Sequence, residues 1–310
     1  MRIVFMGSAD FGIPALKKIT THHELIAVVS TPAKPQGRGL KLADSPITQF
    51  ASSSLDVPVL TPASLKDTAF EDKLREFNAD LFVVVAFKIL PKSIFSIPPL
   101  GTVNIHASLL PKFRGPAPIQ RAIENGEKET GVTIFRIDEG IDTGEIILQK
   151  RVEIGNTETT PELYQRLSLC GADALIDALS ILESGHFEPL QQNHEIASKA
   201  PKLSKDEAKI NWNLNSMEIF NKIRAFKPFP GTFTVLDNKR LGIQWAEPIF
   251  DNSQGDPGKI IAVAKDSFTV QCGSGKLRIL SVKPEGKKEM DVHAFLLGTN
   301  TIRPGNSFGI

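Results

Sequence analysis

Thiols and tyrosines are scarce in this chain of 310 residues, which has two cysteines and a single tyrosine. Cys170 and Cys272 lie far apart in the sequence, and neither has a neighbouring thiol. This arrangement excludes a disulfide framework and a Cys-x-x-Cys metal site. Apolar runs are also short, and none approaches the roughly 20 residues that a membrane-spanning helix requires. We therefore expect neither a bound metal nor a membrane anchor.

An excess of one charge is also missing, because 36 Lys and Arg residues nearly balance 35 Asp and Glu residues. Residues 203–310 are mildly basic, with 15 Lys and Arg against 11 Asp and Glu. This asymmetry indicates an anionic partner for the C-terminal part, although an evenly solvated surface explains it equally well. The first residues begin directly as a strand, without a signal-peptide pattern, which predicts a cytoplasmic protein.

Short apolar, β-branched runs alternate with helical patterns through the first half of the chain. This order is typical of an α/β fold with a Rossmann-like sheet. A long helix is predicted to begin at Thr160-Pro161-Glu162, which has an N-cap followed by proline, and to stop at Gly185. The strands expected before it cover residues 2–6, 25–30, 57–60, 81–87, 102–106, 131–137 and 145–154.

The pattern changes after residue 186. Residues 186–206 show no clean period, and five short β-type runs separated by turn residues follow residue 232. Such spacing predicts a small β-barrel of the OB type. We therefore divide the chain into a domain of residues 1–189, a linker of residues 190–202 and a second domain of residues 203–310.

The first glycine-rich turn, Gly7-Ser-Ala-Asp10-Phe11-Gly12, does not predict a dinucleotide site. It lacks the middle glycine that allows a pyrophosphate to approach the backbone. The second strand ends in Ser30-Thr31, without the carboxylate that would bind a ribose. The turn is better explained as a structural connection between a strand and a helix.

Asn104 and His106 are the first candidate catalytic residues. On a strand over residues 102–106 they share one face, because strand side chains alternate. The carboxyl end of such a strand opens onto the crevice where α/β proteins bind ligands. A third candidate, Asp142, lies in the flexible turn Gly140-Ile-Asp142-Thr-Gly144. Histidine can accept a proton from an amine, asparagine can donate to an oxyanion, and aspartate can orient the imidazole.

These residues stand within longer motifs: Asn104-x-His106-x-Ser108-Leu-Leu-Pro111, then Arg114-Gly115 and Pro118-Ile-Gln, then Gly140-x-Asp142-Thr-Gly144. In this combination the chain resembles the formyltransferases that use 10-formyltetrahydrofolate, over nearly its whole length. The resemblance implies a catalytic N-terminal domain, an OB-like C-terminal domain, and catalytic roles for Asn104, His106 and Asp142.

The resemblance also implies a folate site. The co-substrate would be 10-formyltetrahydrofolate, and no metal would take part. The residues expected to bind the folate are Ser108, Leu109, Leu110, Pro111, Phe87, Ile89 and Leu90. The loop between Phe87 and Leu90 is shorter here than in many members of the family.

Within the family, the chain is most similar to the members that formylate initiator methionyl-tRNA. The loop Gly37-Arg38-Gly39-Leu-Lys41, the segment Lys202–Trp212 and the motif Arg224–Gly231 carry this likeness. It implies that Lys34, Arg38 and Lys41 contact tRNA, that residues 203–310 bind the tRNA backbone, and that the protein acts as a monomer. Without the resemblance, the basic loop is equally well explained as a solvated surface.

Three other functions remain open from the residues alone. A formyltransferase acting on a sugar or nucleotide amine would use the same catalytic set and would need no basic loop. A formyltetrahydrofolate hydrolase would use water in place of the amine. A folate- or RNA-binding module without activity is disfavoured by the intact Asn104, His106 and Asp142 set.

Overall fold

The computed structural model describes residues 1–36, 41–185, 188–251 and 255–309. The chain forms two compact units, each built from three stretches of sequence. The first contains Met1–Pro118, Glu129–Glu153 and Tyr164–Ala200, and the second contains Ile119–Lys128, Ile154–Leu163 and Pro201–Ile310. Residues 190–200 therefore pack with the first unit. The functional division at residues 189 and 203 stays a prediction.

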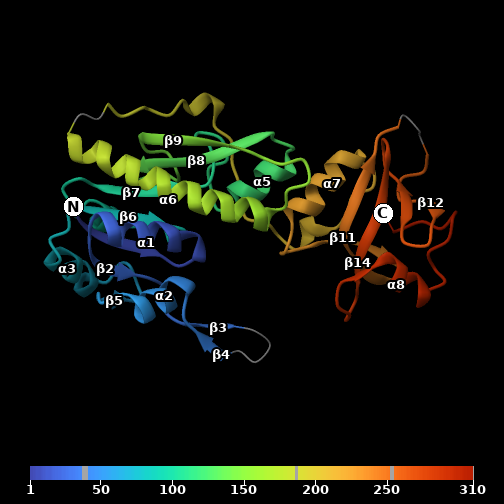
Figure 1. The fold of residues 1–310 in the computed structure, drawn as a ribbon, viewed down its shortest axis with the longest axis horizontal. Coiled ribbons are helices and arrows are strands. Elements are labelled where there is room, and N and C mark those ends of the chain that lie inside the picture. Colours follow the sequence, from blue (N-terminus) through green and yellow to red (C-terminus); the bar gives the residue numbers. More distant parts are fainter. Residues whose placement is uncertain (37–40, 186–187, 252–254, 310) are drawn as a thin grey trace. The chain divides into compact units, whose positions relative to one another are not determined.

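A seven-stranded sheet forms the centre of the first unit (Figure 1), in the order β5-β2-β1-β6-β7-β8-β9. The strands from β5 to β7 run parallel, whereas β8 and β9 are antiparallel to their neighbours. The parallel strands are almost entirely buried, as expected for a sheet covered on both faces. The strands are β1 (Arg2–Gly7), β2 (Glu24–Val29), β5 (Val59–Leu60), β6 (Leu81–Val85), β7 (Thr102–His106), β8 (Glu129–Arg136) and β9 (Ile146–Glu153).

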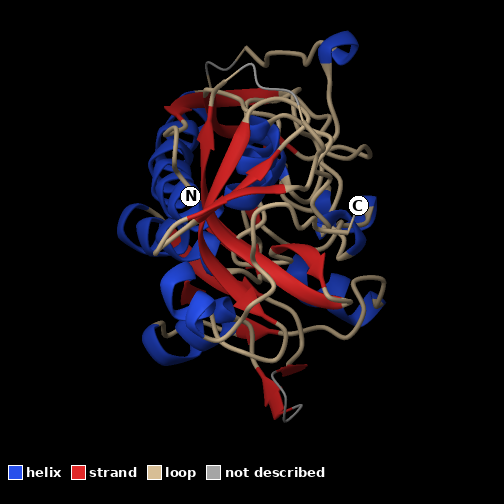
Figure 2. Ribbon diagram, turned by 90° about the vertical axis from the view of Figure 1, so that its right-hand side faces the viewer, coloured by secondary structure: helices blue, strands red, loops and turns tan. Residues whose placement is uncertain are grey.

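Helices cover both faces of this sheet (Figures 1 and 2). On one face, α1 (Ile13–His22) and the long α6 (Thr160–Ser184) are joined by the Lys18–Asp173 ion pair. On the other face, alternate residues of β1 and β6 form a core with α3 (Thr68–Glu76) and α4 (Lys92–Phe95). The first unit also contains α2 (Pro46–Ser54) and the short 3-10 helices η1 (Asp10–Gly12) and η2 (His194–Ile196).

The basic loop predicted after β2 contains a short antiparallel hairpin, β3 (Lys34–Gln36) with β4 (Lys41–Ala43). The prolines and glycines of this loop interrupt the alternating pattern of a strand, so the sequence does not predict the hairpin. The hairpin extends away from the rest of the first unit (Figures 1 and 2). Lys34 and Lys41 are exposed on it, whereas Arg38 lies outside the described residues.

The second unit is built around a largely antiparallel sheet in the order β10-β11-β14-β13-β12, with β15 paired to β14. Trp212 and Phe308 stack in its core, 5.6 Å apart between ring centroids. This architecture is consistent with the predicted OB-like domain. Its elements are β10 (Thr232–Leu236), β11 (Lys239–Ile249), β12 (Ile260–Val263), β13 (Phe268–Gln271), β14 (Lys276–Pro284), β15 (Met290–Asp291), η3 (Asp206–Ala208), α7 (Ser216–Ala225), α8 (Val292–Leu297) and most of α5 (Pro118–Glu124).

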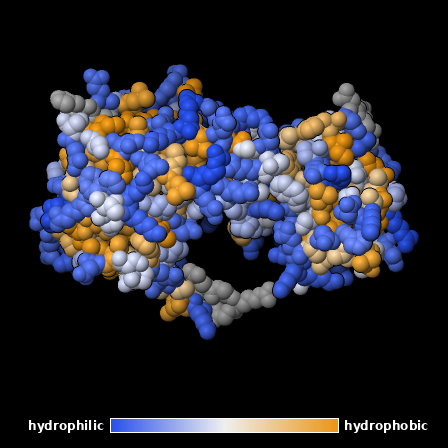
Figure 3. Space-filling view, viewed as in Figure 1, coloured by the Kyte–Doolittle hydropathy of each residue, from blue (hydrophilic) through white to orange (hydrophobic). Residues whose placement is uncertain are grey.

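Hydrophilic residues cover most of the face that Figure 3 shows, with apolar residues scattered between them. Among the described residues, no helix is both long enough and apolar enough to cross a bilayer.

The turn after β1 is fixed to α6 by the single tyrosine. The Tyr164 hydroxyl donates to Asp10 Oδ1 at 2.5 Å and accepts from the Phe11 amide at 2.9 Å. Ser168 Oγ donates to the Phe11 carbonyl at 2.7 Å. These bonds satisfy the buried polar groups of the turn, in agreement with a structural role for it.

Tyr164 gives this turn a spectroscopic signal. Burial raises the pKa of Tyr164, and its hydrogen bond to Asp10 adds to that effect. We expect tyrosinate absorbance to be absent from the native protein near pH 10, where an exposed phenol is half ionised. Because only the unfolded chain ionises readily there, native stability should fall as the pH rises above about 10. An ultraviolet pH titration measures the ionisation of Tyr164, with Tyr164→Phe as the blank. A midpoint near pH 10 in the native protein would contradict the burial and hydrogen bonding of this hydroxyl.

Candidate active site

Asn104 and His106 lie at the carboxyl end of β7, as predicted. Asn104 pairs with Val84 of β6 on one side and Phe135 of β8 on the other, while His106 pairs with Thr133. His106 is buried and Asn104 is half-buried. Within the part of the chain that the structure describes, the Asn104 amide has no hydrogen-bond partner. It is therefore free to donate to a ligand.

The ring of His106 is held on both sides. Its Nε2 lies 2.9 Å from the Phe113 carbonyl, so Nε2 carries a proton and donates it. Its Nδ1 lies 3.6 Å from Asp142 Oδ2. Phe135 packs against the ring edge-on, with the ring centroids 6.4 Å apart. In the neutral imidazole, Nδ1 is thus the proton-accepting nitrogen, and it faces a carboxylate.

Asp142 is positioned by its own backbone and by a second loop. Its φ of 54° is left-handed, a conformation that aspartate tolerates better than most residues and that often occurs at functional sites. Its Oδ2 accepts a hydrogen bond from the Gly115 amide at 2.8 Å. The structure therefore brings His106 and Asp142 together, as the sequence suggested, and adds Gly115 as an anchor.

A cavity of about 120 Å³ opens between β6, β7 and the Asp142 loop. Asn104 and Asp142 line it, together with three of the residues predicted to bind folate, Phe87, Ile89 and Leu90. Ile89 and Ile141 also line this cavity and are 79% and 60% exposed. The walls combine these apolar side chains with polar ones, among them Lys88, Asp138 and Glu139, and such a mixture suits a flat aromatic ligand with polar edges.

The other predicted folate residues do not line this cavity. Ser108 is fully buried and donates to the Lys112 carbonyl. Leu110 packs with Phe135 and Ile146, and its amide donates to Thr133 Oγ1 at 3.1 Å. Gln149 donates to the Leu110 carbonyl at 2.9 Å. The polar groups of the Ser108–Pro111 turn are thus hydrogen-bonded to other residues of the protein. The folate contacts of this turn stay a prediction.

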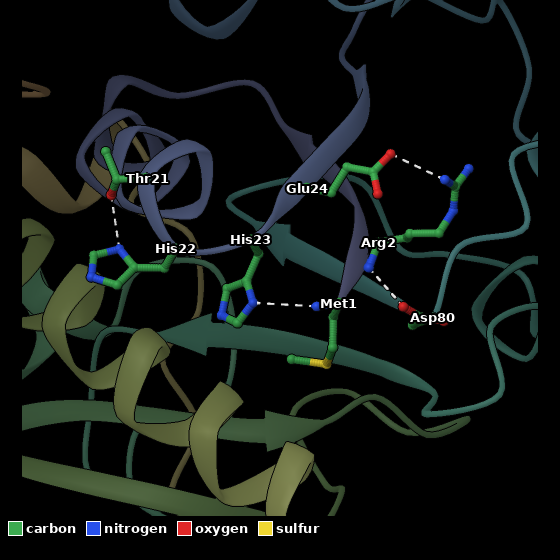
Figure 4. A pocket seen from close by; sticks show the side chains of 7 residues that line it. All are labelled: Met1, Arg2, Thr21, His22, His23, Glu24 and Asp80. Atoms are coloured by element: carbon green, nitrogen blue, oxygen red, sulfur yellow. Dashed lines mark hydrogen bonds and ion pairs between the residues drawn. The ribbon is translucent and has the colours of Figure 1, made fainter.

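A wider hollow lies at the opposite edge of the sheet, beside the first residues of β1 and β2 (Figure 4). There the Met1 amino group lies 3.1 Å from Glu183 Oε1, and Arg2 pairs with Glu24 at 3.0 Å. Burial lowers the pKa of His23, whose Nδ1 faces the Met1 amino group. Charges here neutralise one another, so this hollow is a weaker candidate for catalysis.

Within residues 1–36, 41–185, 188–251 and 255–309, no cluster of three His, Cys, Asp or Glu side chains has the geometry to hold a metal ion.

Comparison with known proteins identifies the fold and the family. The formyl transferase model matches residues 1–179, and the model of the formyl transferase C-terminal domain matches residues 202–300. The chain belongs to the formyl transferase family. The resemblance and the fold class predicted from the sequence are thereby confirmed.

Curated relatives within this family match over the full length. A methionyl-tRNA formyltransferase of Desulforamulus reducens is 41% identical, covering 100% of this chain and 98% of the relative. Another, of Moorella thermoacetica, is 40% identical and covers 100% and 99%. Both formyl transferase units are therefore shared with these enzymes.

Solved structures share the fold at lower identity. An N-formyltransferase from Helicobacter canadensis, in complex with folinic acid and dTDP-3-aminofucose, has a TM-score of 0.68 at 22% identity and covers 89% of this chain and 98% of its own. HypX from Aquifex aeolicus, in complex with tetrahydrofolic acid, has a TM-score of 0.62 at 18% identity and covers 96% of this chain and 47% of its own.

Sequence reasoning missed the groups that hold His106 and Asp142 in place. These are the Phe113 carbonyl, the Gly115 amide and residues 190–200, which were predicted as a linker. The pair Arg114-Gly115 stood in the motif without an assigned role. Gly115 is required by its φ of 121° and because a Cβ there would lie 2.8 Å from the Ala200 carbonyl oxygen.

The Gly115 anchor is testable with Gly115→Ala. The added methyl group must displace either Ala200 or the Gly115 amide that holds Asp142, so we expect a lower melting temperature and a loss of turnover. The matched control is Gly101→Ala, because Gly101 also has a positive φ of 83° and has no atom within 4 Å of the added Cβ. The Gly101→Ala variant should lose only the folding stability that a strained backbone costs, about 1–2 kcal/mol. Equal turnover in the two variants would contradict the anchoring role.

Proposed function

We propose that this protein transfers the formyl group of 10-formyltetrahydrofolate to the α-amino group of initiator methionyl-tRNA, for translation initiation. The observation that carries the proposal is that Asn104 and Asp142 line one cavity and that His106 Nδ1 lies 3.6 Å from Asp142 Oδ2. This arrangement occurs in a chain that matches methionyl-tRNA formyltransferases over its full length. The proposal includes a cytoplasmic, monomeric enzyme whose residues 1–189 perform the reaction and whose residues 203–310 bind tRNA.

The reaction uses the substrate amine as the nucleophile. The amine nitrogen bonds to the formyl carbon, and the formyl oxygen becomes an oxyanion, to which the Asn104 amide donates. His106 Nδ1 takes the proton that the amine releases, and the imidazolium then faces Asp142. The oxyanion then re-forms the C=O bond and the bond between the formyl carbon and the folate nitrogen breaks. The folate nitrogen takes up the proton held by His106, so tetrahydrofolate leaves and His106 returns to its neutral form.

Folate is assigned to the cavity that Asn104 and Asp142 line. Phe87, Ile89 and Leu90 would contact its ring system there. Ser108, Leu109, Leu110 and Pro111 would also bind the folate, as the family resemblance implies. Exposed Ile89 and Ile141 would be covered when the ligand binds.

Methionyl-tRNA is assigned to the β3–β4 hairpin and to the second unit. Exposed Lys34 and Lys41, with Arg38 between them in sequence, give the hairpin a positive charge suited to phosphates. Sugar- and nucleotide-amine acceptors, and water, are the alternatives against which the assay is designed.

The basic role of His106 is tested first. His106→Gln should lower turnover by about 10²–10⁴-fold, because the amine loses its proton acceptor. Initial rates are measured with 10-formyltetrahydrofolate and methionyl-tRNA, a nucleotide sugar amine or water as acceptor. His22→Gln, at the exposed end of α1, is the matched control and should keep wild-type turnover. Turnover near wild type in the His106 variant would contradict its role, and faster transfer to another acceptor would contradict the proposed substrate.

The hairpin is tested by its salt dependence. Arg38→Ala, and Lys34→Ala with Lys41→Ala, should raise the KM for methionyl-tRNA and flatten its dependence on salt, because phosphate contacts are lost. The KM for folate should not change. Lys73→Ala on α3 is the matched control, since Lys73 is an exposed lysine of the same unit, paired with Glu76. An equal rise in both KM values would argue against tRNA contact.

A further inference from the structure

Residues 190–200, which we call the strap, join two loops of the candidate site. At one end, Leu190 and Ile146 exchange backbone hydrogen bonds at the start of β9. At the other end, the Arg114 amide donates to the Ser198 carbonyl at 2.9 Å, and the Ala200 amide donates to the Arg114 carbonyl at 2.6 Å. The strap therefore runs beside the Asp142 loop and the Phe113–Gly115 loop.

Gln192 is the side chain of the strap that links these loops. Its Oε1 accepts from Arg114 Nε at 3.1 Å and from Arg114 Nη2 at 2.6 Å. Its Nε2 donates to the Asp142 carbonyl at 3.0 Å and to the Gly144 carbonyl at 2.7 Å. Gln192 is 5% exposed, and all four of its hydrogen-bonding positions are used.

These bonds act on the distance between Asp142 and His106. The Asp142 backbone has a positive φ and is held by Gln192, while its carboxylate is held by the Gly115 amide next to Arg114. Gln192 therefore holds the Asp142 backbone directly. Through Arg114 it also holds the loop whose Gly115 amide binds the Asp142 carboxylate. A shift of either loop changes the 3.6 Å separation between Asp142 Oδ2 and His106 Nδ1.

We propose that Gln192 is a positioning residue for formyl transfer, which sets Asp142 at the distance where it stabilises the His106 imidazolium. This proposal rests on the proposed function. Gln192 does not touch the reacting atoms in this role, because it acts through Asp142 and Arg114.

The deciding variant is Gln192→Glu. It keeps an acceptor for Arg114 and replaces the amide donor with an oxygen that faces two carbonyls. We expect turnover to fall about 10–100-fold with little change in either KM, since a misplacement of about 1 Å costs that much.

A matched control separates positioning from general destabilisation. The buried Gln271 amide also donates to two carbonyls, those of Cys272 and Gly275, in the second unit. Gln271→Glu should lower the melting temperature comparably and leave turnover and both KM values at the wild-type level. An equal loss of turnover in both folded variants would overturn the proposal.

A second variant tests the hydrogen bonds between Gln192 and Arg114 from the Arg114 side. Arg114→Met removes the partner of Gln192 Oε1, so it should reproduce the loss of turnover, and the double variant should lose little more. His194→Asn replaces the histidine whose Nδ1 lies 3.1 Å from Arg114 Nη2, and this variant should keep wild-type turnover. If Gln192→Glu does not fold, wild-type turnover in Arg114→Met overturns the proposal.

The acceptor assay on the wild-type protein distinguishes a failure of the proposed substrate from a failure of the positioning role of Gln192. Wild-type transfer to another acceptor, with a loss in Gln192→Glu, contradicts the proposed substrate and supports positioning. Wild-type transfer to methionyl-tRNA, with no loss in Gln192→Glu, overturns positioning alone. No transfer to any acceptor overturns both.

Discussion

The carboxylate of Asp142 is the constraint on which the candidate site depends. One oxygen, Oδ2, accepts from the Gly115 amide at 2.8 Å and lies 3.6 Å from His106 Nδ1. Because a backbone amide holds this oxygen, the carboxylate cannot turn without losing a hydrogen bond. The proton-accepting nitrogen therefore has a fixed, negatively charged neighbour, and the site is organised before a substrate arrives.

Local pattern predicts the parts of this site that lie within one strand. Asn104 and His106 share a face because strand side chains alternate, and the carboxyl edge of β7 places Asn104 at a cavity. The contact between His106 and Asp142 follows from no such rule, because Asp142 lies in the loop between β8 and β9, with α5 and β8 between it and β7 in the sequence. The motif suggested Asp142, and only the folded chain gives its distance from the ring.

The groups missed by sequence reasoning share a physical reason. Gln192 bonds to segments far away in the sequence, and a single side chain in an aperiodic stretch leaves no periodic signal. The apolar runs predict that β8 and β9 are strands. They do not indicate that β8 runs antiparallel to β7 or that β9 runs antiparallel to β8. The second unit was easier, since its turns and alternating residues predict an antiparallel sheet.

The strap has a consequence for how the protein is made. A ribosome delivers Asn104, His106 and Asp142 well before residues 190–200, so the nascent chain carries the reactive side chains while Gln192 and Ser198 are still unsynthesised. The loops around Asp142 and Phe113 acquire their outer hydrogen bonds only when the strap emerges. The complete set of hydrogen bonds around the site is therefore a late product of synthesis, and a fragment ending at residue 189 would hold the same chemical groups without the bonds that Gln192 and Ser198 supply to these loops.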